Sequence, residues 1–168
     1  MLTLNYFEIF SLPLKYEIDL KSLKAHYFKL QQEFHPDNYQ ASHEKSAAIK
    51  IASKINIAYE TLSSKLERAR YLLNIMGLTQ SEKEMVLTSE FLINQMELRE
   101  KLNTIKNNSN ELRNFLNTVH EKIAEIFLQF DSLFNQLPES QTILNQKIGE
   151  LLFLNKLKTE AEQHLWQS

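Results

Sequence analysis

His35, Pro36 and Asp37 are the consecutive residues whose types and order most clearly suggest chemistry in this sequence. Proline fixes its own φ and disfavours helical geometry in the residue before it, so a helix must end here. Both flanking polar side chains are then presented at a rigid corner. The carboxylate of Asp37 would accept the guanidinium of a partner's arginine, a strong and directional pairing, and the His35 ring adds a donor and an acceptor.

Taken alone, the tripeptide has a second interpretation. Pro36 would merely stop a helix and Asp37 would cap the next element, because short motifs also occur by chance. The elements on either side must therefore decide between a recognition corner and a structural one.

The other polar residues form no catalytic or metal-binding pattern. The sequence has no histidine pair four residues apart beside a suitable glutamate, and no recognisable nucleophile or phosphate-binding loop. The absence of cysteine excludes disulfides, thiolate ligands and a thiol nucleophile, and it fits a reducing compartment. We therefore expect a protein that is not an enzyme and has no cofactor or metal. The scattered histidines are His26, His35, His43, His120 and His164.

The composition predicts an all-α protein. Gly occurs twice and Pro three times, while 43% of residues are hydrophobic and 24% are charged, which disfavours both β structure and disorder. Residues 1–76 carry ten basic against eight acidic residues, and residues 77–168 carry nine against thirteen. Neither half is basic enough for a general nucleic-acid binder.

No segment of the sequence indicates a membrane or an export route. Apolar runs such as residues 151–154 are far shorter than the roughly 20 residues of a membrane-spanning helix. The residues after Met1 have no basic segment followed by a long apolar one, and no Arg-rich amphipathic extension. We expect a cytoplasmic protein without a nucleic-acid or membrane partner.

Periodicity places the tripeptide between two antiparallel helices. A short helix of about six residues around residues 6–10 comes first, and the cap Asp19 starts a longer helix. That helix has the 3,4,3,4 spacing of a core face. The apolar stripe consists of Leu20, Leu23, Tyr27, Leu30 and Phe34. A loop over about residues 35–42 follows, and a second helical register then runs from residue 48 to residue 73.

The solvent side of the helix after Asp19 is partly basic. At 100° per residue, Lys21 and Lys29 fall well away from the apolar stripe, and Lys24 falls near its border. At the end of the second register, Gly77 suits a C-terminal cap in left-handed geometry. We place the domain boundary between Met76 and Met85.

The second half of the sequence predicts a three-helix bundle, with helices over residues 89–106, 110–136 and 139–166. The middle helix has a coiled-coil-like seam in which apolar residues alternate four and three apart. The seam consists of Leu112, Leu116, Val119, Ile123, Ile126, Phe130 and Leu133. Pro138 suits the first turn of the last helix, where a missing N–H costs nothing.

The helix over residues 89–106 carries two apolar stripes. The bundle face contains the residues within about 40° of Phe91 on the helical wheel, which are Leu98, Leu102 and Ile105. The second stripe lies about 100° to 200° away and contains Leu92, Ile93 and Met96, with Glu97 and Glu100 at its border. On the last helix, Phe153 likewise points away from the core stripe of Leu144, Ile148, Leu151 and Leu154.

Two explanations fit these outward apolar residues. They could pack against the first domain or a neighbouring copy, and single exposed apolar residues need no explanation. A contiguous apolar patch rimmed by charge instead favours a docking surface for a partner. Helical geometry alone leaves both explanations open.

Residues from about 4 to 75 resemble the J-domain. The resemblance rests on Tyr6-Phe7-Glu8-Ile9-Phe10, the part-basic helix, the His-Pro-Asp loop, Ile55-Asn56-Ile57-Ala58-Tyr59-Glu60-Thr61-Leu62 and Arg68-Ala69-Arg70-Tyr71. It implies that His35, Pro36 and Asp37 trigger ATP hydrolysis by a DnaK-type chaperone, and that Lys21, Lys24 and Lys29 dock on it. Such a protein hydrolyses nothing itself.

The remainder looks like the C-terminal domain of HscB, a J-domain co-chaperone family of iron–sulfur cluster assembly. Residues 91–100, a two-helix hairpin and Phe153-Leu154-Asn155-Lys156-Leu157 carry this resemblance. It implies delivery of an IscU-type scaffold protein to an HscA-type chaperone. The implied scaffold-binding residues are Leu92, Ile93, Met96, Glu97, Glu100 and Phe153. The implied organisation is a J-domain over 1–76, a linker over 77–86 and a scaffold-binding bundle over 87–168.

The sequence departs from these relatives at a few points. Asn38 stands where many J-domains carry Lys or Arg, so one docking charge is missing. Ile93 and Met96 replace other large apolar residues, and the Cys-rich module of animal relatives is absent, which favours a bacterial origin. The alternative is a coiled-coil dimerisation or structural adaptor module built on the 112–133 seam, which would be a stable homo-oligomer indifferent to His35. We expect a monomer.

Overall fold

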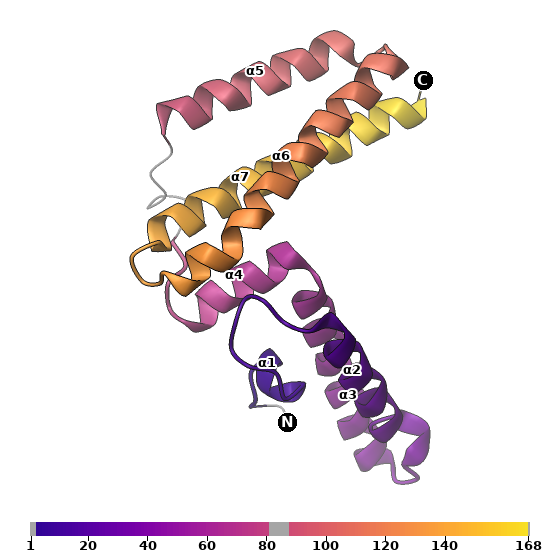
Figure 1. The fold of residues 1–168 in the computed structure, drawn as a ribbon. Coiled ribbons are helices and arrows are strands. Elements are labelled where there is room, and N and C mark those ends of the chain that lie inside the picture. The colour runs from indigo at the N-terminus through magenta and orange to yellow at the C-terminus, as the bar shows by residue number, and fades with distance from the viewer. Residues whose placement is uncertain (1–2, 81–87, 168) are drawn as a thin grey trace. The chain divides into compact units, whose positions relative to one another are not determined.

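The computed structural model describes residues 3–80 and 88–167, and every regular element in these two ranges is a helix (Figure 1). The expected all-α class is confirmed. The chain divides into two compact units between Gly77 and Leu78. Residues 81–86 of the linker expected over residues 77–86, Met85 among them, lie outside the described residues. The linker therefore stays a prediction.

The N-terminal unit begins with α1, Tyr6–Ile9. Asn5 caps it, since its side chain accepts the N–H of Glu8 at 3.0 Å while the Glu8 carboxylate accepts the N–H of Asn5 at 2.8 Å. The helix is shorter than the expected six residues. Ser11 has φ of +50°, which no right-handed helix can include, so the chain turns before Pro13.

An antiparallel hairpin of α2, Leu20–Glu33, and α3, Ser42–Ser63, forms the body of this unit (Figure 1). Leu23 is buried in the expected stripe of α2, whereas Leu20 in the first turn is half exposed. The rings of Tyr27 and Tyr59 stack 4.0 Å apart across the hairpin. The Tyr27 hydroxyl donates to the side-chain oxygen of Asn56 at 3.1 Å. These contacts fix the two helices that flank the loop.

The apolar register that runs from residue 48 to residue 73 belongs to two helices. Ser64 has an extended backbone, which separates α3 from α4, Lys65–Ile75. Its hydroxyl accepts the N–H of Glu67 at 3.3 Å, so Ser64 is the N-cap of α4. Gly77 follows α4 with φ of +69°, the left-handed geometry expected from the sequence.

The C-terminal unit is a three-helix bundle of α5, Ser89–Ile105, α6, Ser109–Asn135, and α7, Gln141–Gln167. The α6 and α7 helices form a long antiparallel pair, and α5 packs on both (Figure 1). These bounds agree with the predicted ranges to within two residues. The buried seam residues of α6 include Leu112, Leu116, Val119, Ile126 and Phe130.

Pro138 does not lie in the first turn of α7, where the sequence placed it. The Ser140 carbonyl accepts the first helical bond of α7, from the N–H of Leu144 at 2.9 Å. The helix therefore begins after Ser140, and Pro138 belongs to the turn between α6 and α7.

A buried amide holds the chain that follows Gly77 onto α7. Asn145 is 3% exposed, and its side-chain N–H group donates to the carbonyl of Leu78 at 3.0 Å. Its oxygen accepts the N–H of Gln80 at 3.0 Å, and Gln141 also donates to the Leu78 carbonyl at 3.0 Å. Residues 78–80 are thus part of the C-terminal unit.

Candidate functional site

The residues His35, Pro36 and Asp37 form an exposed corner between α2 and α3. His35 has an extended backbone, with ψ of 130°, because Pro36 follows it. Pro36 then starts a single 3₁₀ turn, η1, Pro36–Asn38. The His35 and Asp37 side chains are 56% and 78% exposed, so both polar groups are available to a partner protein.

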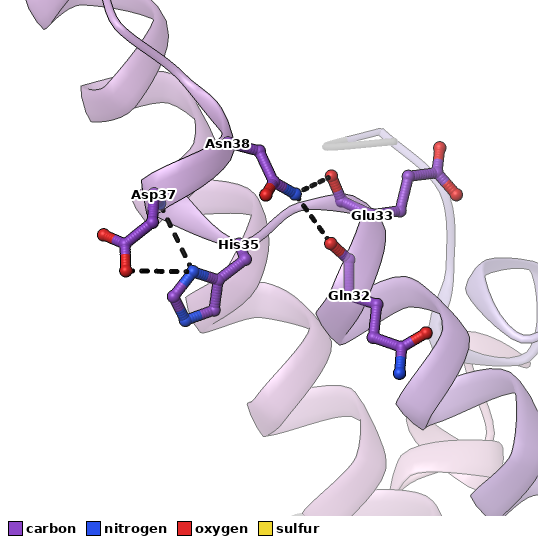
Figure 2. A network of polar contacts seen from close by, with 5 residues as sticks. All are labelled: Gln32, Glu33, His35, Asp37 and Asn38. Carbon is purple, nitrogen blue, oxygen red and sulfur yellow. Dashed lines mark hydrogen bonds and ion pairs between the residues drawn. The ribbon is translucent and has the colours of Figure 1, made fainter.

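The imidazole of His35 is oriented by Asp37 (Figure 2). Its Nδ1 accepts the backbone N–H of Asp37 at 3.3 Å and lies 3.6 Å from the Asp37 carboxylate. In the neutral ring, this bond leaves the proton on Nε2. The corner therefore offers an N–H donor and a carboxylate acceptor side by side.

Asn38 closes the corner from the other side. Its side-chain N–H groups donate to the carbonyls of Gln32 at 2.8 Å and Glu33 at 3.4 Å (Figure 2). Both carbonyls belong to the last turn of α2, where no intrahelical donor remains. The sequence marked Asn38 only as a missing charge, because a bond from a loop to a helix end follows no spacing rule.

The three lysines expected to dock are all exposed on α2. At 100° per residue, Lys21 and Lys24 lie within about 60° of each other, and Lys29 is set further round the helix. Between Lys21 and Lys24 on the wheel lies Phe28, which is 54% exposed, with the ammonium of Lys24 at 5.8 Å from its ring centre. The basic surface thus has an apolar component that was not expected from the sequence.

The second apolar stripe of α5 is exposed in its own unit. Leu92, Ile93 and Met96 are 44%, 57% and 63% exposed, and the flanking carboxylates of Glu97 and Glu100 are exposed as well. The bundle face of the same helix is buried, most completely at Leu102 and Ile105. Helix α5 therefore presents an acid-flanked apolar surface, as the two-stripe pattern predicts.

Phe153 is not stranded outside the core, as the helical wheel of α7 suggested. It is half-buried, and its ring meets the ring of Phe91 on α5 edge-on, with centroids 6.4 Å apart. The guanidinium of Arg99 lies 5.5 Å from the Phe153 ring centre. Because Arg99 neighbours Leu92 on the α5 wheel, Phe153 borders the exposed stripe without being part of it.

A buried arginine supports the hairpin that carries the corner. Arg68 of α4 is 2% exposed, and its Nε donates to the carbonyl of Tyr16 at 2.8 Å. A second guanidinium nitrogen donates to the carbonyl of Leu62 at the end of α3. Burial lowers the pKa of Arg68 from its ordinary value. Arg68 ties the segment before α2 to the junction of α3 and α4.

The start of α2 is held by a charged cap. The carboxylate of Asp19 accepts the Ser22 hydroxyl at 2.7 Å and the N–H of Lys21 at 2.9 Å. These two hydrogen bonds, the first more than the second, lower the pKa of Asp19.

Among residues 3–80 and 88–167, no group of three or more His, Asp and Glu residues is arranged to hold a metal ion. No helix in the same ranges has the length and apolar character needed to span a membrane.

Comparison with known families matches both halves of the chain. The DnaJ domain matches residues 5–71, and the HSCB C-terminal oligomerisation domain matches residues 87–162. Co-chaperone protein HscB homologs of Vibrio cholerae strains are 34% identical to this chain over 165 residues. The alignment covers 95% of this chain and 96% of the relative.

Solved structures agree with these matches. The chaperone HscB from Vibrio cholerae superposes with a TM-score of 0.80 at 34% identity, over 98% of this chain and 99% of the other. Human co-chaperone protein HscB has a TM-score of 0.86 at 24% identity, over 96% of this chain and 82% of the other, which shows the fold alone. The sequence relationship over nearly the full length of both chains shows that this protein belongs to the HscB family of J-domain co-chaperones.

Proposed function

We propose that this protein stimulates ATP hydrolysis by a DnaK-family chaperone of the HscA type. The observation that carries the proposal is the exposed corner of His35 and Asp37, held at the end of a helix whose solvent side is basic. The exposed Asp37 carboxylate can accept an arginine of the chaperone, and His35 can donate from Nε2. The protein itself acts as an activator and carries out no hydrolysis.

Electrostatic attraction supports the docking step. Lys21, Lys24 and Lys29 are exposed on α2, the helix that leads into the corner. Such surface charges raise the rate of encounter with an acidic partner surface more than they raise final affinity, and salt screens them. The exposed ring of Phe28 adds apolar contact area among these charges.

We further propose that α5 binds an IscU-type scaffold protein and brings it to the chaperone, in the maturation of iron–sulfur proteins. The exposed Leu92, Ile93 and Met96 form the apolar part of this surface, and Glu97 and Glu100 form its charged rim. Phe153 contributes from its partly buried position next to Arg99. The iron–sulfur cluster is cargo of the scaffold, and the setting is the bacterial cytoplasm.

The stimulation is tested by single-turnover ATP hydrolysis by the cognate chaperone. Wild type should accelerate hydrolysis, and His35→Gln should not. The glutamine amide cannot reproduce the imidazole, which accepts the Asp37 N–H at Nδ1 and can donate to the partner from Nε2. His120→Gln, which changes an exposed histidine of α6, is the matched control and should behave as wild type. Equal stimulation by wild type and His35→Gln would overturn this part of the proposal.

The electrostatic contribution has its own control. Changing Lys21, Lys24 and Lys29 together to Ala should raise the half-stimulating concentration at low salt. This difference from wild type should shrink as the salt concentration increases, because salt screens the charges. Changing the exposed Lys15, Lys45 and Lys50 to Ala removes the same net charge outside the α2 face. If both triple variants raise the half-stimulating concentration by the same factor, the net charge of the protein and not the basic face of α2 drives docking.

Scaffold binding is tested with variants of α5 alone. Leu92, Ile93 and Met96 changed together to Ala should keep basal stimulation and lose both calorimetric binding of the scaffold and its synergy with the chaperone. Leu128→Ala, at an 83% exposed position of α6, is the apolar control. Undiminished scaffold binding by the triple variant would refute the client surface.

A dimerisation or adaptor module remains the alternative for the second half. The name of the matching C-terminal domain family mentions oligomerisation. Leu112, Val119 and Phe130 of the seam are, however, buried within the bundle, so these side chains are not available to a second copy. We propose a monomer, and light scattering across a concentration series tests it, since a constant dimer mass would contradict it.

A further inference from the structure

We propose that Asn38 is a positioning residue that holds the corner of His35 and Asp37 in one geometry by fastening the following turn to the end of α2. The inference rests on the proposed stimulation of a chaperone, and it concerns how the corner is kept ready for that partner.

The hydrogen bonds of Asn38 satisfy groups that α2 leaves open. The carbonyl of Leu30 receives the N–H of Phe34 at 2.9 Å, which closes the last regular turn of α2. The carbonyls of Gln32 and Glu33 come later and have no helical donor. The side-chain N–H groups of Asn38 reach these two carbonyls at 2.8 and 3.4 Å (Figure 2).

The two hydrogen bonds from the Asn38 side chain, which we call the Asn38 clamp, close a short loop of backbone that contains the corner. The chain leaves α2 at Glu33, passes through His35, Pro36 and Asp37, and returns to the same helix end through the Asn38 side chain. Within this loop of backbone, the backbone N–H of Asn38 donates to the His35 carbonyl at 3.0 Å. These bonds therefore hold the backbone of Asp37 close to the end of α2.

The Tyr39 side chain adds a weaker contact of the same kind. Its hydroxyl lies 3.5 Å from the Glu33 carbonyl, at the limit of a hydrogen bond. Two consecutive residues after the corner thus direct donors to the end of α2.

The Asn38 clamp gives position 38 a role even though the position lacks a docking charge. A lysine there would supply a docking cation, whereas Asn38 restrains the geometry of the loop. A partner that binds only one loop geometry has an apparent affinity reduced by the fraction of molecules in that geometry. Keeping the fraction high through a clamp therefore strengthens binding without an added charge.

The first test concerns the protein without any partner. Asn38→Leu keeps a similar volume and removes both donors, and Gln40→Leu makes a matched change at an exposed position two residues later. Backbone ¹⁵N relaxation should show a lower order parameter for the Asp37 amide in Asn38→Leu and no change in Gln40→Leu. An unchanged order parameter in Asn38→Leu overturns the clamp whether or not any chaperone is stimulated.

The second test separates affinity from activation. In single-turnover hydrolysis, Asn38→Leu should raise the half-stimulating concentration roughly three- to tenfold and leave the maximal rate as in wild type, because loss of one net hydrogen bond lowers the competent fraction by about that factor. A lowered maximal rate at an unchanged half-stimulating concentration would assign Asn38 a different role and reject the clamp. Failure of wild type to stimulate would reject the proposed function, and the relaxation measurement would still decide on the clamp.

A lysine substitution distinguishes order from charge. Asn38→Lys adds a docking cation and removes the clamp, so it should be as impaired as Asn38→Leu at about 0.5 M salt, where surface charges are screened. Stimulation by Asn38→Lys equal to that of wild type at this salt concentration would show that the clamp contributes nothing.

Discussion

The ring of Phe153 on α7 meets the ring of Phe91 on α5 with centroids 6.4 Å apart and planes inclined at 78°. The guanidinium of Arg99 covers Phe153 at 5.5 Å from its ring centre. Phe153 thus joins α5 to the α6–α7 pair. A substitution at Phe153 changes the stability of the bundle as well as any surface that it shares with a partner, so it cannot test client binding by itself.

We expect Phe153→Ala to lower the free energy of unfolding by about 2 kcal/mol. An edge-to-face aromatic pair contributes roughly 0.5–1.5 kcal/mol beyond burial, and the lost half-buried area adds a similar amount. Urea denaturation of the full chain, followed at helix and tertiary signals, measures the change. Phe91→Ala should produce a loss of the same order, because it removes the other ring of the pair.

Met96→Ala is the control for this measurement, since Met96 is 63% exposed on the same helix face that borders Phe153. Its effect on unfolding should stay within about 0.5 kcal/mol. If Phe153→Ala is as mild as Met96→Ala, the ring contact does not hold α5 on the bundle.

Arg68→Met should destabilise the N-terminal unit by about 2–4 kcal/mol. The methionine fills a similar volume but leaves the carbonyls of Tyr16 and Leu62 without donors, and each unsatisfied buried group costs roughly 1–3 kcal/mol. The guanidinium also lies 5.1 Å from the Tyr16 ring centre, a contact that the substitution removes. Thermal and urea unfolding of the full chain would measure the loss.

Arg70→Met is the matched control two residues further along α4. Arg70 is exposed and pairs only at the surface with Glu67 at 3.1 Å, an interaction worth less than about 1 kcal/mol. Equal destabilisation by the two substitutions would show that the buried hydrogen bonds of Arg68 add nothing to the stability of the N-terminal unit.

Features that depend on a single helix could be predicted from the sequence. The seam residues Leu112, Val119 and Phe130 are almost fully buried because the 3.6-residue period alone decides which face of α6 meets the core. Gly77 has the expected left-handed φ because few other residues tolerate it. The His35 corner followed from the local effect of Pro36 on the backbone.

Features that depend on contact between elements could not be predicted in this way. The wheel of α7 turned Phe153 away from the core, but α5 covers that side of the helix and supplies Phe91. The break at Ser64 was hidden because α4 continues the apolar register of α3, although the Ser64 to Glu67 spacing is a capping signal. The roles of Asn38 and Arg68 come from bonds to distant carbonyls, which no periodicity indicates.

Asn145→Leu should release residues 78–80 from α7. The substitution keeps the volume but leaves the Leu78 carbonyl with only the Gln141 donor and the Gln80 N–H with no acceptor. We expect a loss of about 2 kcal/mol in unfolding free energy, because buried polar groups lose their partners. Hydrogen exchange at the Gln80 amide measures the local effect and should accelerate at least tenfold.

An exposed asparagine of the same bundle provides the control for Asn145. Asn103→Leu on α5 changes the same chemical group at the surface, where water can replace its bonds. It should leave Gln80 exchange unchanged. Slow exchange at Gln80 in Asn145→Leu would mean that other contacts hold the segment.

Asp19 should make the stability of the N-terminal unit depend on pH in acid. The Ser22 hydroxyl, and after it the Lys21 N–H, hydrogen-bond the carboxylate and lower its pKa below the ordinary value of 3.8. The folded state therefore binds the proton more weakly than the unfolded state does. The stabilisation is fully present above the unfolded value and is lost as the pH falls through the lower folded value.

The measurement compares wild type with Asp19→Asn, because asparagine also caps helices but does not titrate in acid. All other carboxylates titrate alike in both proteins, so the difference between their unfolding midpoints isolates Asp19. Any advantage of wild type should be constant from about pH 7 to pH 5 and should shrink progressively toward about pH 2. Parallel pH profiles for the two proteins would show that the cap bonds of Asp19 do not favour its charged form.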